Sequence, residues 1–214
     1  MRRALAALVI VIAVGAAAYT QWRAGTVPAT VAKTEAEQRV LDVLQEMRRE
    51  GRIHLEVPEA DGRMLRVLAE AIDAQQVVEV GTSTGYSALW MAMALRNTGG
   101  RLTTFEIDPG RAAQARQHFQ QAGVDDIVTV VEGNAHETLT RINGPVDLVF
   151  LDAEKEGYVA YLERLLPLVR PGGLVLAHNT GMVPDYIRAV RENSALDTVL
   201  YTEGAGLSIS VKKR

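Results

Sequence analysis

Short apolar runs alternate along most of the chain with longer segments in which apolar residues recur every three or four positions. The short runs predict β-strands, because they are rich in valine, isoleucine and other residues that pack well on a pleated sheet. These runs cover residues 77–80, 102–107, 127–131, 146–151, 174–177, 198–201 and 207–211. Helical spacing is clearest at residues 111–122, 158–169 and 185–193. The alternation predicts an α/β fold with a doubly wound, Rossmann-like sheet of seven strands.

Two amphipathic helices are predicted before the first strand. Thr34, with Glu37 three residues later, matches a capping box and begins the first helix, which Gly51 ends. Asp61 opens the second helix, whose apolar stripe continues to Ile72. Both helices therefore have one face suited to packing against the domain.

The first predicted strand ends in a glycine turn. Gly81 follows residues 77–80 directly, Gly85 follows four residues later, and an apolar helix-forming run then begins. Strand, tight turn and helix in this order are typical of the first unit of a nucleotide-binding sheet. Glycine has no Cβ, so a ligand can approach the backbone closely. The middle glycine of the dinucleotide fingerprint is missing, which favours a smaller nucleoside ligand over a pyrophosphate.

Polar residues stand at the ends of later strands, where ligands bind in doubly wound folds. Glu106 ends the second strand, and an acid at this position can accept both hydroxyls of a ribose. Asp152 ends the fourth strand, whose unbroken apolar run is typical of a central strand buried on both faces. His178 and Asn179 end the fifth strand. We expect these side chains to converge on one crevice.

The N-terminal segment differs from the rest of the chain, because residues 4–22 carry no charge. We expect residues 1–24 to form an apolar helix that anchors the chain at a membrane, since its length just suffices to span a bilayer core. The alternatives are a signal peptide cleaved after the small residues 16–18, which would leave a secreted or periplasmic protein, and a soluble helix. Residues 25–32 would be a linker, and residues 33–214 the α/β domain. Positive charges on the two sides nearly balance, so the side of the membrane stays open.

Composition and charge exclude several classes of function. The chain has 214 residues, enough for one α/β domain and an extension, and a net charge of −3. Charges of both signs are mixed, so no basic stripe argues for binding of nucleic acid. The chain has no cysteine, which excludes disulfides, zinc-thiolate sites and thiol catalysis.

The segment EVGTSTGYSALWMA resembles motif I of the class I S-adenosylmethionine-dependent methyltransferases. Its part GYSAL is similar to the catechol and caffeoyl-CoA O-methyltransferase group, and the resemblance covers residues 57–213. It implies the class I methyltransferase fold, methyl transfer from S-adenosylmethionine to a hydroxyl of a small catechol-like or phenolic acceptor, and a homodimer. It also implies cofactor contacts from Glu79, Gly81, Ser83, Gly85, Tyr86, Ser87, Glu106, Ile107, Gly133, Ala135, His136 and Asp152.

The pattern D-x-x-K-x-x-Y that begins at Asp152 is similar to that of the metal-dependent members of this group. The resemblance implies that Asp152 binds a divalent cation and that Lys155 is the base for the acceptor hydroxyl. The chain departs from the family at His178, because the usual pair there is Asp-Asn and only Asn179 matches. A second departure is the segment 204–206, which is Gly-Ala-Gly where the family often has Gly-Asp-Gly.

Replacing a carboxylate by an imidazole changes the expected metal. Two carboxylates and an amide oxygen suit Mg²⁺, whereas an imidazole favours Mn²⁺ or a later transition metal. We expect Asp152, His178 and Asn179 to form one divalent-metal site. Two alternatives stay open: a metal-independent methyltransferase with His178 as the base, and a membrane-tethered cofactor-binding module without turnover.

Overall fold

The computed structural model describes residues 30–50, 57–202 and 204–214. The apolar helix expected within residues 1–24 lies outside these ranges. In the part of the chain that is described, no helix is both long enough and apolar enough to cross a membrane.

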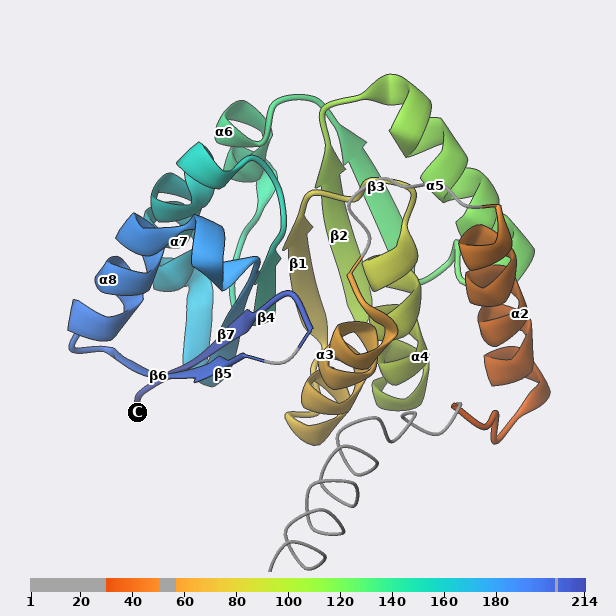
Figure 1. The fold of residues 1–214 in the computed structure, drawn as a ribbon, viewed down its shortest axis with the longest axis horizontal. Helices are drawn as coiled ribbons and strands as arrows, with labels where there is room; N and C mark the ends of the chain where they lie inside the picture. Colours follow the sequence, from red (N-terminus) through yellow and green to blue (C-terminus); the bar gives the residue numbers. More distant parts are fainter. Residues whose placement is uncertain (1–29, 51–56, 203) are drawn as a thin grey trace, which may run out of the picture. The chain divides into compact units, whose positions relative to one another are not determined.

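A seven-stranded sheet forms the centre of the unit that begins at residue 32 (Figure 1), with the strand order β3-β2-β1-β4-β5-β7-β6. The strands are β1 (Gln76–Val80), β2 (Arg101–Glu106), β3 (Val128–Glu132), β4 (Val146–Leu151), β5 (Val169–His178), β6 (Leu196–Tyr201) and β7 (Leu207–Lys212). Strands β1 to β5 pair in parallel, and β7 is antiparallel to β5 and β6. The doubly wound fold predicted from the sequence is confirmed. The chain order reverses between β1 and β4, so their carboxyl ends border the crevice in which such folds bind ligands.

Helices cover both faces of the sheet, because successive side chains of a strand point to opposite faces. In β1, Val77 packs in the core with the first group of helices, and Val78 packs in the core with the second. The first group is α2 (Glu35–Arg49), α3 (Glu59–Ala71), α4 (Tyr86–Thr98) and α5 (Pro109–Ala122). The second is α6 (Ala135–Thr138), α7 (Tyr158–Leu165) and α8 (Pro184–Glu192) (Figure 1). Short 3₁₀ turns are η1 (Leu139–Arg141), η2 (Lys155–Gly157), η3 (Leu166–Leu168) and η4 (Thr180–Met182).

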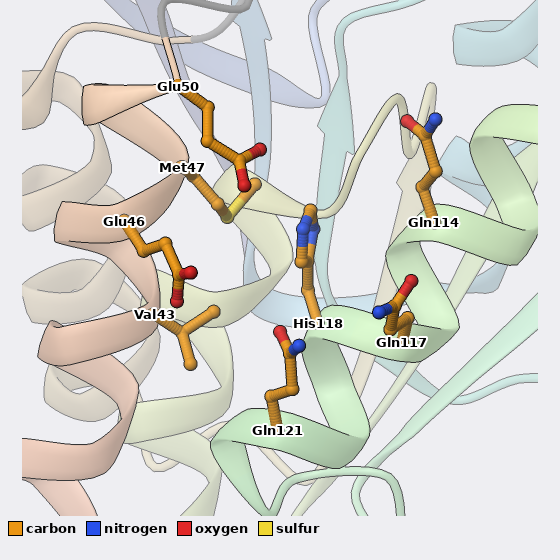
Figure 2. A pocket seen from close by; sticks show the side chains of 8 residues that line it. All are labelled: Val43, Glu46, Met47, Glu50, Gln114, Gln117, His118 and Gln121. Carbon is orange, nitrogen blue, oxygen red and sulfur yellow. The ribbon is translucent and has the colours of Figure 1, made fainter.

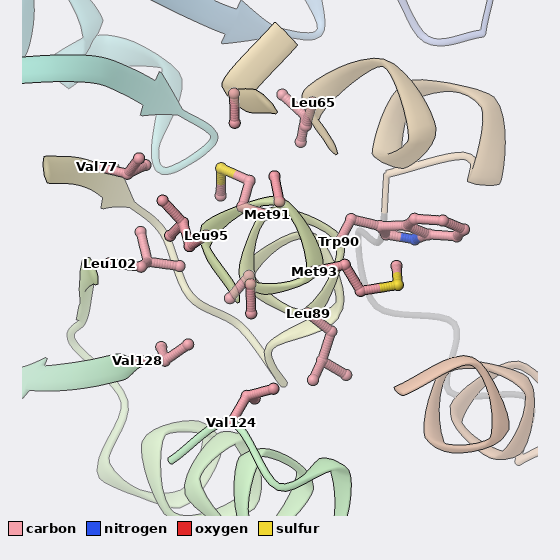
Figure 3. Close-up of a cluster of buried hydrophobic side chains, with 14 of the residues drawn as sticks. Leu65, Val77, Leu89, Trp90, Met91, Met93, Leu95, Leu102, Val124 and Val128 are labelled. Carbon is pink, nitrogen blue, oxygen red and sulfur yellow. The ribbon is translucent and has the colours of Figure 1, made fainter. Parts of the chain in front are cut away.

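Helix α4 is buried all round, which explains why its sequence is apolar without a polar face. Figure 3 shows it end-on, with its leucine and methionine side chains directed outward in several directions into the core. Helix α3 covers its outer side, where Gly62 contacts the indole of Trp90 so closely that an added Cβ would lie 2.3 Å from a ring carbon. This close packing holds α3 against the helix that follows the glycine turn.

The structure confirms the capping box of α2, because the hydroxyl of Thr34 accepts a hydrogen bond from the backbone N–H of Glu37. Two other expectations were wrong. Helix α3 begins at Glu59, so Asp61 lies inside the helix and does not cap it. Strand β5 begins at Val169, earlier than expected, because Val169 pairs with Val146 before a bulge that contains a proline and two glycines.

Candidate functional site

A cavity of about 730 Å³ opens at the carboxyl ends of β1, β2 and β4. It is lined by residues from the turns after these strands, as expected for a doubly wound sheet. The residues predicted from the sequence that border it are Gly81, Ser83, Tyr86, Ser87, Glu106, Ile107, Gly133, Ala135, His136, Asp152, Lys155 and Asn179.

The glycine turn brings the backbone against the floor of this cavity. Gly81 has a φ of +100°, and a Cβ there would lie 2.3 Å from the carbonyl oxygen of Asp152. Ser83, two residues on, also has a positive φ, of 49°. Its hydroxyl is buried and has no hydrogen-bond partner among the described residues. An unpaired buried hydroxyl beside a cavity is a group that a bound ligand can satisfy.

Glu106 is fixed in place before any ligand binds. One carboxylate oxygen accepts the backbone N–H of Ser83 at 2.7 Å, and the other accepts that of Asp108 at 3.0 Å. Only 5% of the residue is exposed, and that part borders the cavity. An ionised carboxylate has about four lone-pair sites, so two further hydrogen bonds can be accepted.

Two of the predicted cofactor residues do not line the cavity. Glu79 is fully buried and accepts hydrogen bonds from Ser87 and Thr104. Burial outweighs these hydrogen bonds and raises the pKa of Glu79 to about 8. At Gly85, a Cβ would lie 2.6 Å from the ring of Phe119, so this glycine serves the packing of the turn against α5.

An aromatic pair closes one end of the cavity. The ring of His136 stacks on that of Tyr161, with centroids 4.6 Å apart, and its Nε2 lies 3.1 Å from a carboxylate oxygen of Glu154. The hydroxyl of Tyr161 donates to the same carboxylate oxygen. The three side chains therefore hold one another, and all three border the cavity.

A smaller cavity, of about 150 Å³, lies between α2 and α5 and shares no lining residue with the first (Figure 2). His118 of α5 borders it, and Nδ1 of its ring lies 2.8 Å from the carbonyl oxygen of Thr84. A carbonyl oxygen only accepts, so Nδ1 donates and ties α5 to the glycine turn. The small cavity therefore lies next to the contact between α5 and the glycine turn, and it contributes no side chain to the lining of the large cavity.

Residues 31–196 match the model of a protein family described as O-methyltransferase. The chain belongs to this O-methyltransferase family. Catechol O-methyltransferase from Mycobacterium tuberculosis is 46% identical over 121 residues, which cover 55% of this chain and 54% of that protein. Catechol O-methyltransferase from Niastella koreensis is 40% identical over 122 residues, covering 55% of each protein. The chain thus matches about half the length of these curated relatives.

A solved O-methyltransferase has the same fold. It is the O-methyltransferase TomG from Streptomyces achromogenes, crystallised in complex with SAM. The TM-score is 0.72 at 26% sequence identity, and the match covers 86% of this chain and 92% of that chain.

Lys155 and Asp152, which the sequence suggested as catalytic residues, lie side by side at the cavity. Nζ of Lys155 lies 3.0 Å from Oδ1 of Asp152 and 2.8 Å from the hydroxyl of Tyr158. Burial, together with the charge of Asp152, raises the pKa of Tyr158 far above its ordinary value. The tyrosine hydroxyl therefore keeps its proton and positions the lysine.

His178 does not border the cavity. Its Nδ1 lies 3.2 Å from Oδ2 of Asp152, and its Nε2 lies 3.0 Å from Oδ2 of Asp61. Asp61 is completely buried, and its Oδ2 also accepts the backbone N–H of Ala205. Its other oxygen, Oδ1, has no hydrogen-bond partner in the part of the chain that the structure describes.

The arrangement does not fit the divalent cation expected from the sequence. Asp152 and Asn179 border the cavity, but both ring nitrogens of His178 are occupied by carboxylates on opposite sides of the ring. The described residues contain no group of three or more His, Cys, Asp or Glu side chains placed to hold a metal ion. Occupied nitrogens also leave His178 unable to act as the base of a metal-independent reaction.

Sequence reasoning missed several residues of the site. Asp61 carried a recognisable signal, because it shares one helix face with the buried residues Leu65 and Ala69, at a spacing of four. An acid on the buried face of a helix requires a partner. Other residues that line the cavity without having been predicted, such as Arg111, Glu154 and Tyr161, carried no comparable signal.

Proposed function

We propose that this chain transfers a methyl group from S-adenosylmethionine to a hydroxyl of a small catechol-like or phenolic acceptor. One observation carries the proposal: a single cavity contains both the glycine turn with Glu106 and the pair of Asp152 and Lys155. Its volume, about 730 Å³, lies in the range of ~300–1,000 Å³ typical of small-molecule sites. We name these two groups of residues the cofactor half (Gly81, Ser83 and Glu106) and the acceptor half (Asp152 and Lys155, with the buried His178 and Asp61 behind them).

The residues of the cofactor half fit an adenosyl cofactor. The prearranged carboxylate of Glu106 would accept the two ribose hydroxyls, for which it has free lone pairs. The close approach of backbone at Gly81 and the unpaired hydroxyl of Ser83 are further features that a ligand would complete. His136, stacked on Tyr161, would lie beside the adenine.

The acceptor half supplies proton handling and orientation. When bound, S-adenosylmethionine supplies an activated methyl group whose bond to sulfur breaks as the acceptor oxygen forms the new bond. In-line displacement depends mostly on positioning. Nζ of Lys155 would take the hydroxyl proton, with Oδ1 of Asp152 at 3.0 Å and the tyrosine hydroxyl at 2.8 Å holding it in place.

Apolar residues at the rim support an aromatic acceptor. Val57 borders the cavity from the residues just before α3, and Met182 borders it from η4, after β5. The methionine is 65% exposed, so its side chain is accessible to a ligand. A flat phenolic ring against it would bury apolar surface of both.

The test is a methyl-transfer assay with labelled S-adenosylmethionine and a panel of catechols and phenols. Substitution of Lys155 by methionine keeps the length of the side chain and removes its basic nitrogen. We expect at least a ~100-fold lower kcat, as is typical for loss of a general base, with cofactor affinity unchanged. An active Lys155→Met enzyme would contradict the role of the lysine, and an inactive wild type with every acceptor would contradict the function.

We also propose that residues 1–24 hold the protein at a membrane, on the strength of their uncharged length alone. Fractionation of cells that produce the full-length chain tests this proposal. Recovery in the soluble fraction with the N-terminus intact would contradict it, and a shortened N-terminus would favour the signal peptide. A homodimer, which the family resemblance implies, is tested by light scattering of residues 33–214.

A further inference from the structure

His178 is enclosed in the protein interior between two carboxylates. Only 2% of the residue is exposed, and each ring nitrogen faces a carboxylate oxygen, at 3.0 Å on Asp61 and 3.2 Å on Asp152. An ionised carboxylate only accepts hydrogen bonds, so both nitrogens donate, and an imidazole that donates from both nitrogens is an imidazolium. Burial opposes this charge, but the hydrogen bonds and charges of Asp152 and Asp61 outweigh it and raise the pKa of His178.

Charges of alternating sign connect helix α3 to the cavity. Asp61 is followed by His178, then by Asp152, whose Oδ2 faces the imidazole and whose Oδ1 faces Nζ of Lys155. While Lys155 holds the proton that it must release before it can act as a base, two anions and two cations balance without any added ion. A divalent cation on Asp152 would stand beside two positive groups and would have to displace one of them.

Displacing His178 is strongly disfavoured because of Asp61. This carboxylate is completely buried, and its partners besides the imidazole are limited, among the described residues, to the backbone N–H of Ala205 at 3.3 Å. Without the imidazolium it would be a buried charge with no counter-charge, which proteins avoid. In this chain, the side chain of His178 therefore occupies the place beside Asp152 that a cation would take.

We infer that His178 takes the place of a divalent cation, so that methyl transfer by this chain needs no metal and accepts phenols with a single hydroxyl. The inference rests on the proposed function. A metal would orient its carboxylate ligands and would also chelate two neighbouring oxygens of the acceptor. His178 performs the first task, because it holds Asp152, but it has no free N–H and no exposure with which to perform the second. It is a positioning residue that acts through Asp152.

Metal titration of the wild type is the first test. Chelator-treated protein is titrated with Mg²⁺, Mn²⁺ and Zn²⁺ by calorimetry, and methyl transfer to catechol and to phenol is measured before and after each addition. We expect no stoichiometric binding, undiminished activity after chelation, and turnover of both acceptors. Binding of one ion per chain together with activity that requires it would overturn the inference.

The wild type also allows a measurement without turnover. In protein labelled with ¹⁵N at histidine, one imidazole protected from solvent should show two N–H groups at neutral pH, and Asp61→Asn should remove this signature or alter its shifts. A single N–H on His178 would contradict the inference. The number of N–H groups and the metal titration can both be measured even if no acceptor is methylated. A failure to methylate any acceptor would count against the proposed function and not against this inference.

His178→Asp restores the carboxylate of the family pattern, so it should convert an enzyme that needs no metal into one that does. We expect loss of metal-free activity by ~10- to 100-fold, the usual effect of removing a group that orients a ligand, and recovery with Mg²⁺ on catechol but not on phenol. His178→Gln is the matched control, because it removes the charge without adding a carboxylate; it should lose activity without recovery. Full metal-free activity of both folded variants would overturn the role of His178.

Discussion

In the cofactor half of the cavity, the groups that face a ligand come from the ends of neighbouring parallel strands and from the backbone of one turn. Glu106 is oriented by two backbone N–H groups, one of them only two residues away. In the acceptor half, Asp152 is oriented by side chains, and the outermost of them, Asp61, lies 117 residues from its partner His178. The first half is built by local backbone geometry, the second by buried charges from distant elements.

The difference predicts different sensitivities to mutation. A backbone-built site loses its geometry only when the turn itself is changed, because each peptide group is held by the strands. A chain of buried charges fails when any one member is removed, because its neighbour is left charged and unpaired. The predictions below test this contrast, beginning with the largest expected effect.

Asp61→Asn should lower the free energy of unfolding by ~3–5 kcal/mol, because it leaves the buried imidazolium of His178 with one counter-charge fewer. Urea unfolding followed by circular dichroism measures the loss. The matched control is Asp185→Asn, which removes an ion pair with Arg188 whose side chains are 79% and 63% exposed. This control should change stability by less than ~1 kcal/mol. Equal effects of the two substitutions would refute the buried charge chain.

Gly81→Ala should cost ~3 kcal/mol and abolish cofactor binding. The substitution combines a positive φ with a Cβ placed 2.3 Å from the carbonyl oxygen of Asp152. Gly99→Ala is the control, because its φ is also positive, at 78°, while nothing lies within 4 Å of the added Cβ. The control should cost only ~1–2 kcal/mol of backbone strain and leave cofactor binding intact. Thermal unfolding and calorimetry with S-adenosylmethionine measure both quantities.

Glu106→Ala should weaken binding of S-adenosylmethionine by ~10- to 100-fold, the equivalent of losing one charge-assisted hydrogen bond or more. Calorimetry measures the affinity directly. Glu132→Ala is a suitable control, since Glu132 ends the next strand along the sheet but lies outside the cavity. Unchanged affinity in Glu106→Ala would show that the ribose is held elsewhere.

Glu79 gives an effect that depends on pH and that is the smallest when it is counted per pH unit. Its pKa rises from 4.5 to about 8 on folding, so between these values the folded protein holds a proton that the unfolded chain has lost. The free energy of unfolding should therefore fall as pH rises through this window, by up to ~1.4 kcal/mol per pH unit. Glu79→Gln should remove this part of the slope, whereas substitution of the exposed Glu163 by glutamine should not. Parallel slopes for wild type and Glu79→Gln would contradict the raised pKa.

Much of the cofactor half could be predicted from the sequence. The strands follow from apolar runs, the turn from Gly81, and the position of Glu106 from its place after the second strand. Each of these signals depends on residues that are neighbours in the chain, and parallel strands bring their carboxyl ends together without further information. The prediction from sequence was wrong for Glu79, which was expected to contact the cofactor and is instead buried under α4. Its alternation with Val78 and Val80 already places it on the face of the sheet that α4 covers.

The acceptor half was decided by tertiary structure. The sequence identifies Asp152, Lys155 and His178 as strand-end or turn residues, but it does not show that the imidazole faces away from the cavity toward Asp61. That contact depends on the packing of α3 against α4, where Gly62 meets Trp90. The protonation of a buried imidazole is set by the charges around it, and those charges come from segments far apart in the chain. Local pattern therefore determined the family and the ligand crevice, whereas three-dimensional packing determined which side chains surround Asp152 behind the crevice.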